Sequence, residues 1–172
     1  MKPDGGDDAA IDALNRFLTH YHTVAKRARD EDRLILNQVC IRVDDIDATE
    51  RLLSESFGID GFVRPGGELF RGESDLSVAW VSDEIYLELM EPLEPQTVGY
   101  DTGSGLPIGH LSEIGFFVPD LDRELERLAD LGWQVQDSIE AHGARMVKID
   151  TDPPSGVPVE LVEVQIGKRE PM

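Results

Sequence analysis

Two parts of this chain repeat the same pattern in the same order, and this repeat constrains the fold more than any other feature. CIRVDDID at Cys40–Asp47 aligns with GFFVPDLD at Gly115–Asp122, an offset of 75 residues (115 − 40). LELME at Leu87–Glu91 aligns with VELVE at Val159–Glu163, an offset of 72 residues (159 − 87). The difference of three residues fits a deletion in a loop. A duplicated sequence predicts two copies of one supersecondary unit that pack against each other.

Each half predicts one strand, one helix and then three more strands. The strands show apolar residues in alternation, and the helices begin after aspartates and stop at Gly58 and Gly132. In the first half we expect a strand at 36–43, a helix at 48–57 and strands at 61–70, 76–81 and 85–90. In the second half we expect a strand at 113–118, a helix at 120–131 and strands at 133–137, 145–149 and 157–164. A linker rich in Gly and Pro spans 94–109.

The N-terminal segment predicts an additional amphipathic helix. No Gly or Pro interrupts residues 8–30, and one side of this helix carries five apolar residues: Ile11, Leu14, Leu18, Tyr21 and Ala25. An exposed apolar stripe is unfavourable for a monomer, so it must pack on its own chain or on a partner. We expect the partner contact, in a homodimer. We divide the chain into an N-terminal helical extension at 1–33 and a domain at 34–168, with modules at 34–98 and 99–168.

Composition narrows the classes of partner and the location. The net charge of −19 repels phosphate backbones and anionic membranes, so neither nucleic acid nor membrane is an expected partner. No apolar run approaches the roughly 20 residues of a membrane helix, and the N-terminus shows no secretory signal. The single Cys40 cannot form an internal disulfide. We therefore expect a cytoplasmic protein whose partner is a small-molecule substrate.

The repeat also identifies pairs of equivalent polar positions on strands. Gln38 is equivalent to Glu113 at the first offset, and Glu88 is equivalent to Glu160 at the second. Because side chains alternate across a strand, each of the four lies on the face opposite its apolar neighbours. If that face lines a cavity, a carboxylate there is costly unless it is paired, protonated or bound to a cation.

Four runs of this sequence resemble the vicinal-oxygen-chelate superfamily: VCIRVDDIDATERLLSESFGI, IYLELMEPLEP, EIGFFVPDLDRELERLADLGW and GVPVELVEV. This superfamily includes glyoxalase I, methylmalonyl-CoA epimerase, extradiol dioxygenases and bleomycin-resistance proteins. The order and spacing of the runs carry the resemblance, which covers 34–164 and leaves out the N-terminal helix. It implies an α+β fold in which two βαβββ modules form a cup-shaped curved sheet.

The resemblance also implies a metal site. In metal-dependent members the ligands come from the first and last strand of each module, which here are Gln38, Glu88, Glu113 and Glu160. Many members have His at the first-strand positions, and Glu at the third position is unusual. The lack of His argues against an extradiol dioxygenase, which uses two His and one carboxylate around iron. Oxygen donors suit a hard divalent cation such as Mg or Mn, although Ni, Co and Fe are not distinguished.

The function that follows from this resemblance is a metal-dependent lyase or isomerase/epimerase of the glyoxalase type. It would act on a small carbonyl compound through an enediolate, with Glu113 or Glu160 as the proton shuttle. Arg42 and Tyr86 share strand faces with the predicted ligands, and we expect them to bind substrate. The alternative is a non-catalytic binding or resistance protein that uses the same cup without a metal.

Several other residues are weaker candidates for a functional site. Arg42 or Arg145 could instead pair with Glu88 or Glu160 in a purely structural role. His110 and His142 lie in predicted loops, whereas His20 and His22 belong to the N-terminal helix. We expect Cys40 to be a small buried residue and not a nucleophile, because no His is spaced to activate it.

Overall fold

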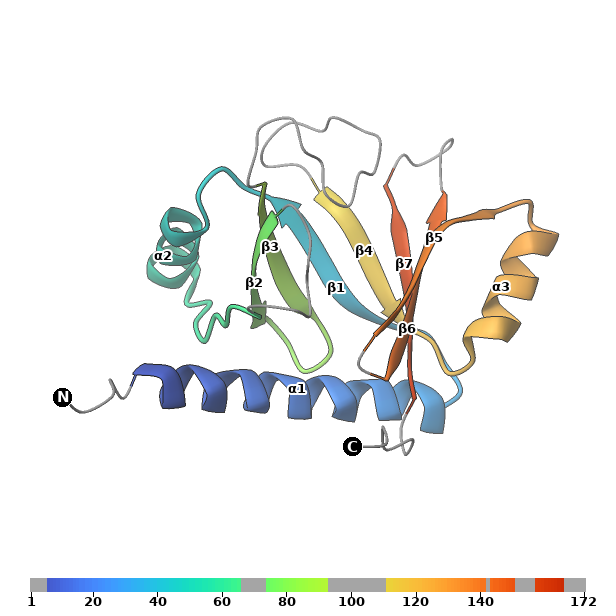
Figure 1. Cartoon of the computed structure of the whole chain (residues 1–172), viewed down its shortest axis with the longest axis horizontal. Helices are drawn as coiled ribbons and strands as arrows, with labels where there is room; N and C mark the ends of the chain where they lie inside the picture. Colours follow the sequence, from blue (N-terminus) through green and yellow to red (C-terminus); the bar gives the residue numbers. More distant parts are fainter. Residues whose placement is uncertain (1–5, 66–73, 93–110, 142, 151–156, 166–172) are drawn as a thin grey trace.

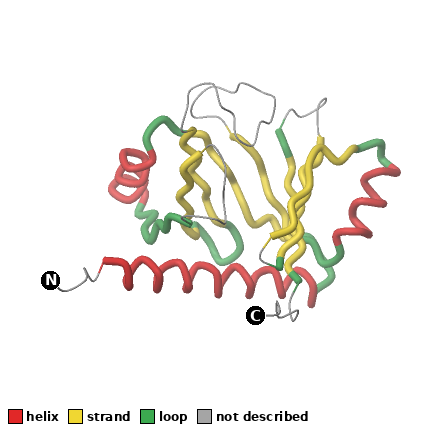
Figure 2. Tube along the Cα trace, in the orientation of Figure 1, coloured by secondary structure: helices red, strands yellow, loops and turns green. Residues whose placement is uncertain are grey.

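The computed structural model describes residues 6–65, 74–92, 111–141, 143–150 and 157–165. Three helices and seven strands lie in these ranges (Figures 1 and 2). In chain order they are α1 (Gly6–Asp30), β1 (Ile35–Arg42), α2 (Ile46–Phe57), β2 (Ser74–Trp80), β3 (Tyr86–Pro92), β4 (Leu111–Phe117), α3 (Leu121–Asp130), β5 (Gln134–Ala141), β6 (Ala144–Asp150) and β7 (Val159–Val164). The predicted linker at 94–109 lies outside the described residues.

All seven strands form one curved sheet in the order β2-β3-β1-β4-β7-β6-β5. The first strands of the two halves, β1 and β4, pair antiparallel at its centre, and each pairs in parallel with the last strand of its own half. Cys40 lies opposite Glu88 in the first half, and Gly115 lies opposite Glu160 in the second. These two pairs are equivalent at the offsets of 75 and 72 residues, so the structure confirms the predicted duplication and the α+β fold.

The two repeated helices begin with the same local structure. Asp45 and Asp120, 75 residues apart, are the N-caps of α2 and α3, with backbone angles that agree within one degree. Each carboxylate accepts a hydrogen bond from a backbone N–H three residues later, at 2.8 Å from Ala48 and 3.0 Å from Arg123. Such caps satisfy donors that the first helical turn leaves without a partner.

One predicted strand, at 61–70, is wrong over the part that the structure describes. Within residues 61–65, Val63 forms only an isolated bridge with Val78. Gly58 and Gly61 both have positive φ, which turns the chain instead of extending it, and Pro65 has no N–H to donate to a ladder. The other strand predictions agree with the structure to within a few residues at each end.

Different helices pack on the two faces of the sheet. One face packs against α2 and α3 through two apolar clusters, one around Ile46 and Leu89 and one around Leu121 and Ile149. We call the opposite face, which carries Gln38, Cys40, Glu88, Glu113 and Glu160, the site face. Figure 1 shows α2 and α3 flanking the sheet at its two sides.

Helix α1 packs on the site face of its own chain. Val24, Ala25 and Ala28 are buried against Ile35, Phe117 and Val162. Phe117 and Val162 follow Gly115 and Glu160 by two residues on the same strands, which places α1 next to the predicted site. In Figure 1 the helix runs across the end of the sheet where β1 begins and β4 ends. Ala25 belongs to the predicted apolar stripe, and Leu14 and Tyr21 of the same stripe also pack on the sheet, so for these residues packing in the same chain replaces the expected contact with a partner.

The homodimer itself stays a prediction. Ile11, at the N-terminal end of the stripe, is 55% exposed, so α1 does not bury its whole apolar side. None of the described helices combines the length and the apolar composition needed to span a membrane.

Candidate active site

The structure brings the four predicted ligands together on the site face. All are buried, with exposed fractions of 2% to 7%: Gln38, Glu88, Glu113 and Glu160. Cys40 on β1 lies opposite Glu88 on one side and Glu113 on the other. Gly115 on β4 likewise lies opposite Gln38 and Glu160. The four central strands thus place all four side chains in one patch at the middle of the sheet.

Three contacts link four buried side chains across this patch. The Tyr86 hydroxyl donates to Gln38 Oε1 at 3.0 Å, and Gln38 Nε2 donates to Glu113 Oε1 at 3.0 Å. Lys148 on β6 forms an ion pair with the other oxygen of Glu113, with Nζ 2.7 Å from Oε2. The Tyr86 hydroxyl therefore sets the orientation of the Gln38 amide, and both carboxylate oxygens of Glu113 face N–H donors.

Gly115 makes this arrangement possible. A Cβ atom at this position would lie 2.7 Å from Gln38 Oε1 and 2.9 Å from Gln38 Cβ. Both distances are shorter than nonbonded atoms tolerate, so Gln38 could not keep its place next to a larger residue. The glycine is required here for close approach and not for an unusual backbone angle.

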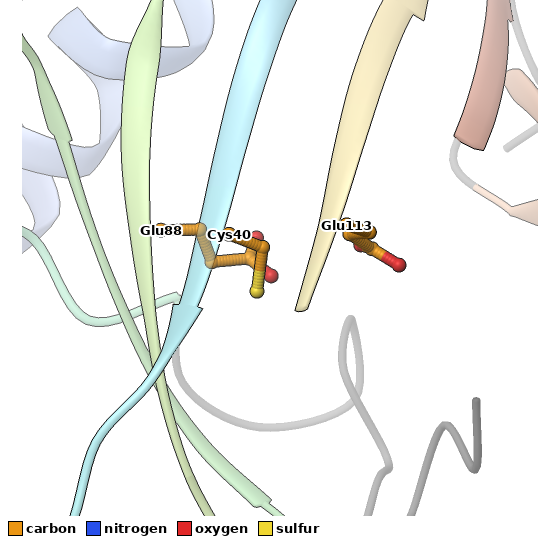
Figure 3. A group of neighbouring side chains, drawn as sticks. All are labelled: Cys40, Glu88 and Glu113. Atoms are coloured by element: carbon orange, nitrogen blue, oxygen red, sulfur yellow. The ribbon is translucent and has the colours of Figure 1, made fainter. Parts of the chain in front are cut away.

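Cys40 lies between two of the carboxylates. Its sulfur and one oxygen each of Glu88 and Glu113 lie within 4.8 Å of one another, close enough for the three to hold a metal ion (Figure 3). Burial and the charges of Glu88 and Glu113 raise the pKa of the Cys40 thiol well above its usual value. The thiol is therefore protonated at neutral pH, which agrees with the prediction of a buried residue that is not a nucleophile.

Burial and mutual repulsion give the carboxyl groups unusual acidities. Burial, followed by the charge of Glu113, raises the pKa of Glu88 to about 7, whereas a hydrogen bond with Cys40 and the charge of Lys148 act in the opposite direction. Burial, then Glu113, raises the pKa of Glu160 well above its usual value. With a pKa of about 7, Glu88 is close to its midpoint at neutral pH, and Glu160 holds its proton more tightly than an ordinary glutamate does. Buried carboxyl groups with raised pKa values on one face of a sheet are suited to general acid–base chemistry.

Helix α1 adds Tyr21 to this site. Its ring lies against Phe117, with centroids 4.6 Å apart, and it also contacts Phe17 and Tyr86. Burial raises the pKa of the Tyr21 hydroxyl, and the nearby charges of Glu160 and Glu88 raise it further. The site is therefore closed by aromatic rings at the end where α1 crosses the sheet.

The comparisons with known proteins can be set against this geometry. A family described as "Glyoxalase/Bleomycin resistance protein/Dioxygenase superfamily" matches residues 37–149, which is more than half of the chain. This chain belongs to that superfamily. The match confirms the resemblance inferred from the four sequence runs, and it begins after α1.

Solved structures of this superfamily have the same fold. A hypothetical protein from Bacillus halodurans has a TM-score of 0.60 at 19% identity, over 81% of this chain and 97% of that one. Methylmalonyl-CoA epimerase from Mycobacterium tuberculosis has a TM-score of 0.59 at 22% identity, over 76% and 87%. A methylmalonyl-CoA epimerase in complex with methylmalonyl-CoA and NH4+ has a TM-score of 0.61 at 20% identity, over 80% and 98%. No curated protein matches the chain.

Some of the oxygen atoms that the resemblance assigns to a divalent cation already have other partners in this structure. Gln38 Oε1 accepts from Tyr86, and both oxygens of Glu113 accept from Gln38 and Lys148. Glu88 and Glu160 remain, together with the protonated thiol of Cys40. A dication could use Glu113 only if the ammonium group of Lys148 moved away, because two buried positive charges repel strongly at such distances.

Arg42 lies on the site face at the end of β1 that is remote from α1. It follows Cys40 by two residues, and its buried Nε has no hydrogen-bond partner among the described residues. Tyr86 lies at the other end, beside the rings of Phe17 and Trp80, and its hydroxyl is used by Gln38. The substrate-binding roles of both residues stay predictions.

The remaining candidates lie elsewhere. Arg145 pairs with Asp122 and Glu163, not with the glutamates of the site. His20 packs edge-on against Trp80 with its Nε2 3.1 Å from the Asp83 carbonyl oxygen, and His22 is exposed. His110 and His142 lie outside the described residues.

Sequence reasoning missed two members of the site, Lys148 and Tyr21. Lys148 could have been found by strand parity, because Val147 and Ile149 are apolar and place it on the opposite face. Nothing in the sequence pointed to Tyr21, which looked like one more apolar residue of the α1 stripe. Its place depends on how α1 packs on the sheet.

Proposed function

We propose that this chain is an enzyme that moves a proton at the carbon next to a carbonyl group, as an isomerase, an epimerase or a lyase. The observation that carries the proposal is that two buried carboxyl groups of the site face have raised pKa values, about 7 for Glu88 and well above the usual value for Glu160. A reaction that passes through an enediolate needs one group that takes a proton from carbon to form it and one that returns a proton to carbon to complete turnover.

In this proposal Glu88 is the base and Glu160 is the acid. The sequence favoured Glu113 or Glu160 as the proton shuttle. Glu113 is less suited to that role because Gln38 and Lys148 occupy both of its oxygens. Its charge instead contributes to the raised pKa of both Glu88 and Glu160, so we assign to Glu113 the role of a positioning residue.

The enediolate oxygen needs positive charge or hydrogen-bond donors around it. A divalent cation, as expected from the sequence, would supply that charge, but Glu88 and Glu160 could not hold it and also serve as the free base and the acid. Lys148 and the Tyr21 hydroxyl are donors that the chain itself brings to this patch. Arg42 is placed to bind an anionic group of the substrate at the end remote from α1.

The names of the structural neighbours suggest the first substrate to test. Methylmalonyl-CoA carries a carboxylate and a thioester carbonyl on either side of the carbon that loses its proton, which matches a cation at Arg42 and acid–base groups at Glu88 and Glu160. A small acyl thioester or another 2-substituted carbonyl compound is therefore the proposed substrate class. The enzyme class, the substrate and the residue roles form one proposal.

The experiment is exchange of the carbon-bound proton for solvent deuterium, followed by NMR in D2O with methylmalonyl-CoA and a panel of small carbonyl compounds. The wild-type chain should catalyse exchange in at least one of them. Glu88→Gln and Glu160→Gln should each slow it by about 100-fold or more while the fold is retained. Glu163→Gln is the matched control, because it lies on the same strand as Glu160 and pairs with Arg145 outside the site.

A second candidate function is a binding or resistance protein that uses the same cup without chemistry. The Lys148–Glu113 ion pair favours it, because a site with its own counter-ion is stable without metal or turnover. Calorimetric binding of the same compounds distinguishes the two. Compounds that bind with no deuterium exchange, and with affinity unchanged by Glu160→Gln, would establish the binding protein and reject the enzyme.

A further inference from the structure

We propose that Lys148 is the built-in cation of this site and that it excludes a divalent metal ion from the buried carboxylates. The proposal concerns the site described above, but it rests on the arrangement of charges and does not require that the site be catalytic. It departs from the metal site that the superfamily resemblance implies for this chain.

The position of Lys148 is the first support. Its Nζ lies 2.7 Å from Glu113 Oε2, and the two side chains are only 7% and 9% exposed. In the pairing of β6 with β7, Lys148 lies directly opposite Glu160. Its charge also opposes the raised pKa of Glu88. One ammonium group thus acts on all three carboxyl groups of the patch, as a bound cation would.

The occupied ligand atoms are the second support. Of the four oxygen-bearing residues predicted to hold a metal, Glu113 has N–H donors at both oxygens, and the oxygen of Gln38 faces the Tyr86 hydroxyl. A divalent ion must therefore break the ion pair and rotate the amide before it gains more than two carboxylates. Within a buried patch, it would also meet the ammonium group at close range, where repulsion is poorly screened.

A lysine in this place has a chemical consequence. An ammonium group carries one charge and three N–H donors, so it can hold Glu113 and still donate to an oxyanion without a coordination geometry. This chemical part rests on the proposed function. The exclusion of metal does not, and it can be tested without any substrate.

The test measures Mn2+ binding to the full chain at neutral pH by electron paramagnetic resonance, after chelator treatment and removal of the chelator. The wild-type protein should show no saturable site. Lys148→Met leaves the carboxylates without their counter-ion, so it should gain one Mn2+ site per chain, with affinity at least about tenfold above any wild-type binding. Mn2+ should raise the Tm of this variant and not that of the wild type.

Arg145→Met is the matched control. It removes a cation from the same strand, but Arg145 pairs with Asp122 and Glu163 outside the site, so no Mn2+ site should appear. A wild-type chain that binds one Mn2+ as tightly as Lys148→Met overturns the proposal. A gain of equal size in Arg145→Met overturns it as well, because the effect would then be one of overall charge.

Lys148→Gln covers the case in which the methionine variant does not fold. Glutamine can still donate a hydrogen bond to Glu113 but carries no charge, so it should fold and bind Mn2+ as expected for the methionine variant. A folded Lys148→Gln without a Mn2+ site contradicts the proposal, and so does a variant that stays unfolded at saturating Mn2+. Because no outcome depends on turnover, a failure of the proposed enzymatic function would leave these results unaffected.

Discussion

Gly115 and Gln38 lie opposite each other on the antiparallel strands β4 and β1, and the space left by the missing Gly115 side chain holds the amide of Gln38. That amide accepts from Tyr86 and donates to Glu113. The orientation of a residue at the centre of the site therefore depends on the absence of one methyl group on the neighbouring strand. The same relationship makes Gly115 a sensitive position for stability.

Gly115→Ala should destabilise the protein by about 1–3 kcal/mol, the usual cost of overpacking a buried position, because its Cβ would overlap Gln38. Urea unfolding followed by circular dichroism measures the change. Ser138→Ala, on exposed strand β5, is the control and should change the free energy of unfolding by less than about 0.5 kcal/mol. Equal stability of Gly115→Ala and the wild type would show that Gln38 does not hold the position described.

Removal of one partner of the buried ion pair should cost more than removal of both. Lys148→Met alone should lower the free energy of unfolding by up to about 3–5 kcal/mol, because it leaves buried carboxylates without their cation. Lys148→Met combined with Glu113→Gln should recover a large part of that loss. A double-mutant cycle from denaturant unfolding gives the coupling, and additive losses would mean that the two groups do not interact.

Stability should depend on pH through Glu88. Its pKa is raised from 4.5 to about 7 in the folded protein, so the folded state binds its proton more tightly than the unfolded state does. The stabilisation from this group is therefore fully present below about pH 4.5 and is lost as the pH rises to about 7. The loss is on the order of 3 kcal/mol.

Glu88→Gln tests this dependence. The variant should remove that fall in stability between acidic and neutral pH, seen as the difference between variant and wild-type unfolding free energies at each pH. The difference is needed because ion-paired carboxylates with lowered pKa values, such as Glu31 and Glu84, change stability in the opposite direction. Glu126→Gln, which is exposed on α3, is the control. A constant difference across the range would contradict a raised pKa at Glu88.

The packing of α1 can be tested by placing a charge on its buried side. Ala28 is fully buried against the sheet, so Ala28→Asp should destabilise the chain by about 3 kcal/mol or more. Thr23→Asp, exposed on the same helix, should have little effect. Thermal unfolding measures stability, and light scattering measures mass in parallel. If Ala28→Asp kept its stability but halved its mass, α1 would pack on a partner, as the sequence analysis expected.

The sequence by itself determined the duplication and, apart from the strand at 61–70, the order of the helices and strands. It also showed that Gln38 is equivalent to Glu113 in the repeat and that Glu88 is equivalent to Glu160. These are local properties. Capping aspartates at matching positions start α2 and α3, and alternation along a strand decides which residues share a face. The same pattern also carried the resemblance to the superfamily, which the comparisons confirm.

Only the tertiary structure decided which contacts the polar side chains of the site face make. The ion pair of Lys148 with Glu113, the orientation of the Gln38 amide and the burial that raises the pKa of Glu88 and Glu160 depend on distances between strands far apart in the sequence. The surface on which α1 packs also could not be decided from the sequence, because its apolar stripe is equally suited to a partner chain and to its own sheet. The periodicity of the sequence shows on which face of a strand a side chain lies. The curvature of the sheet and the register of its strands determine which residues that side chain contacts.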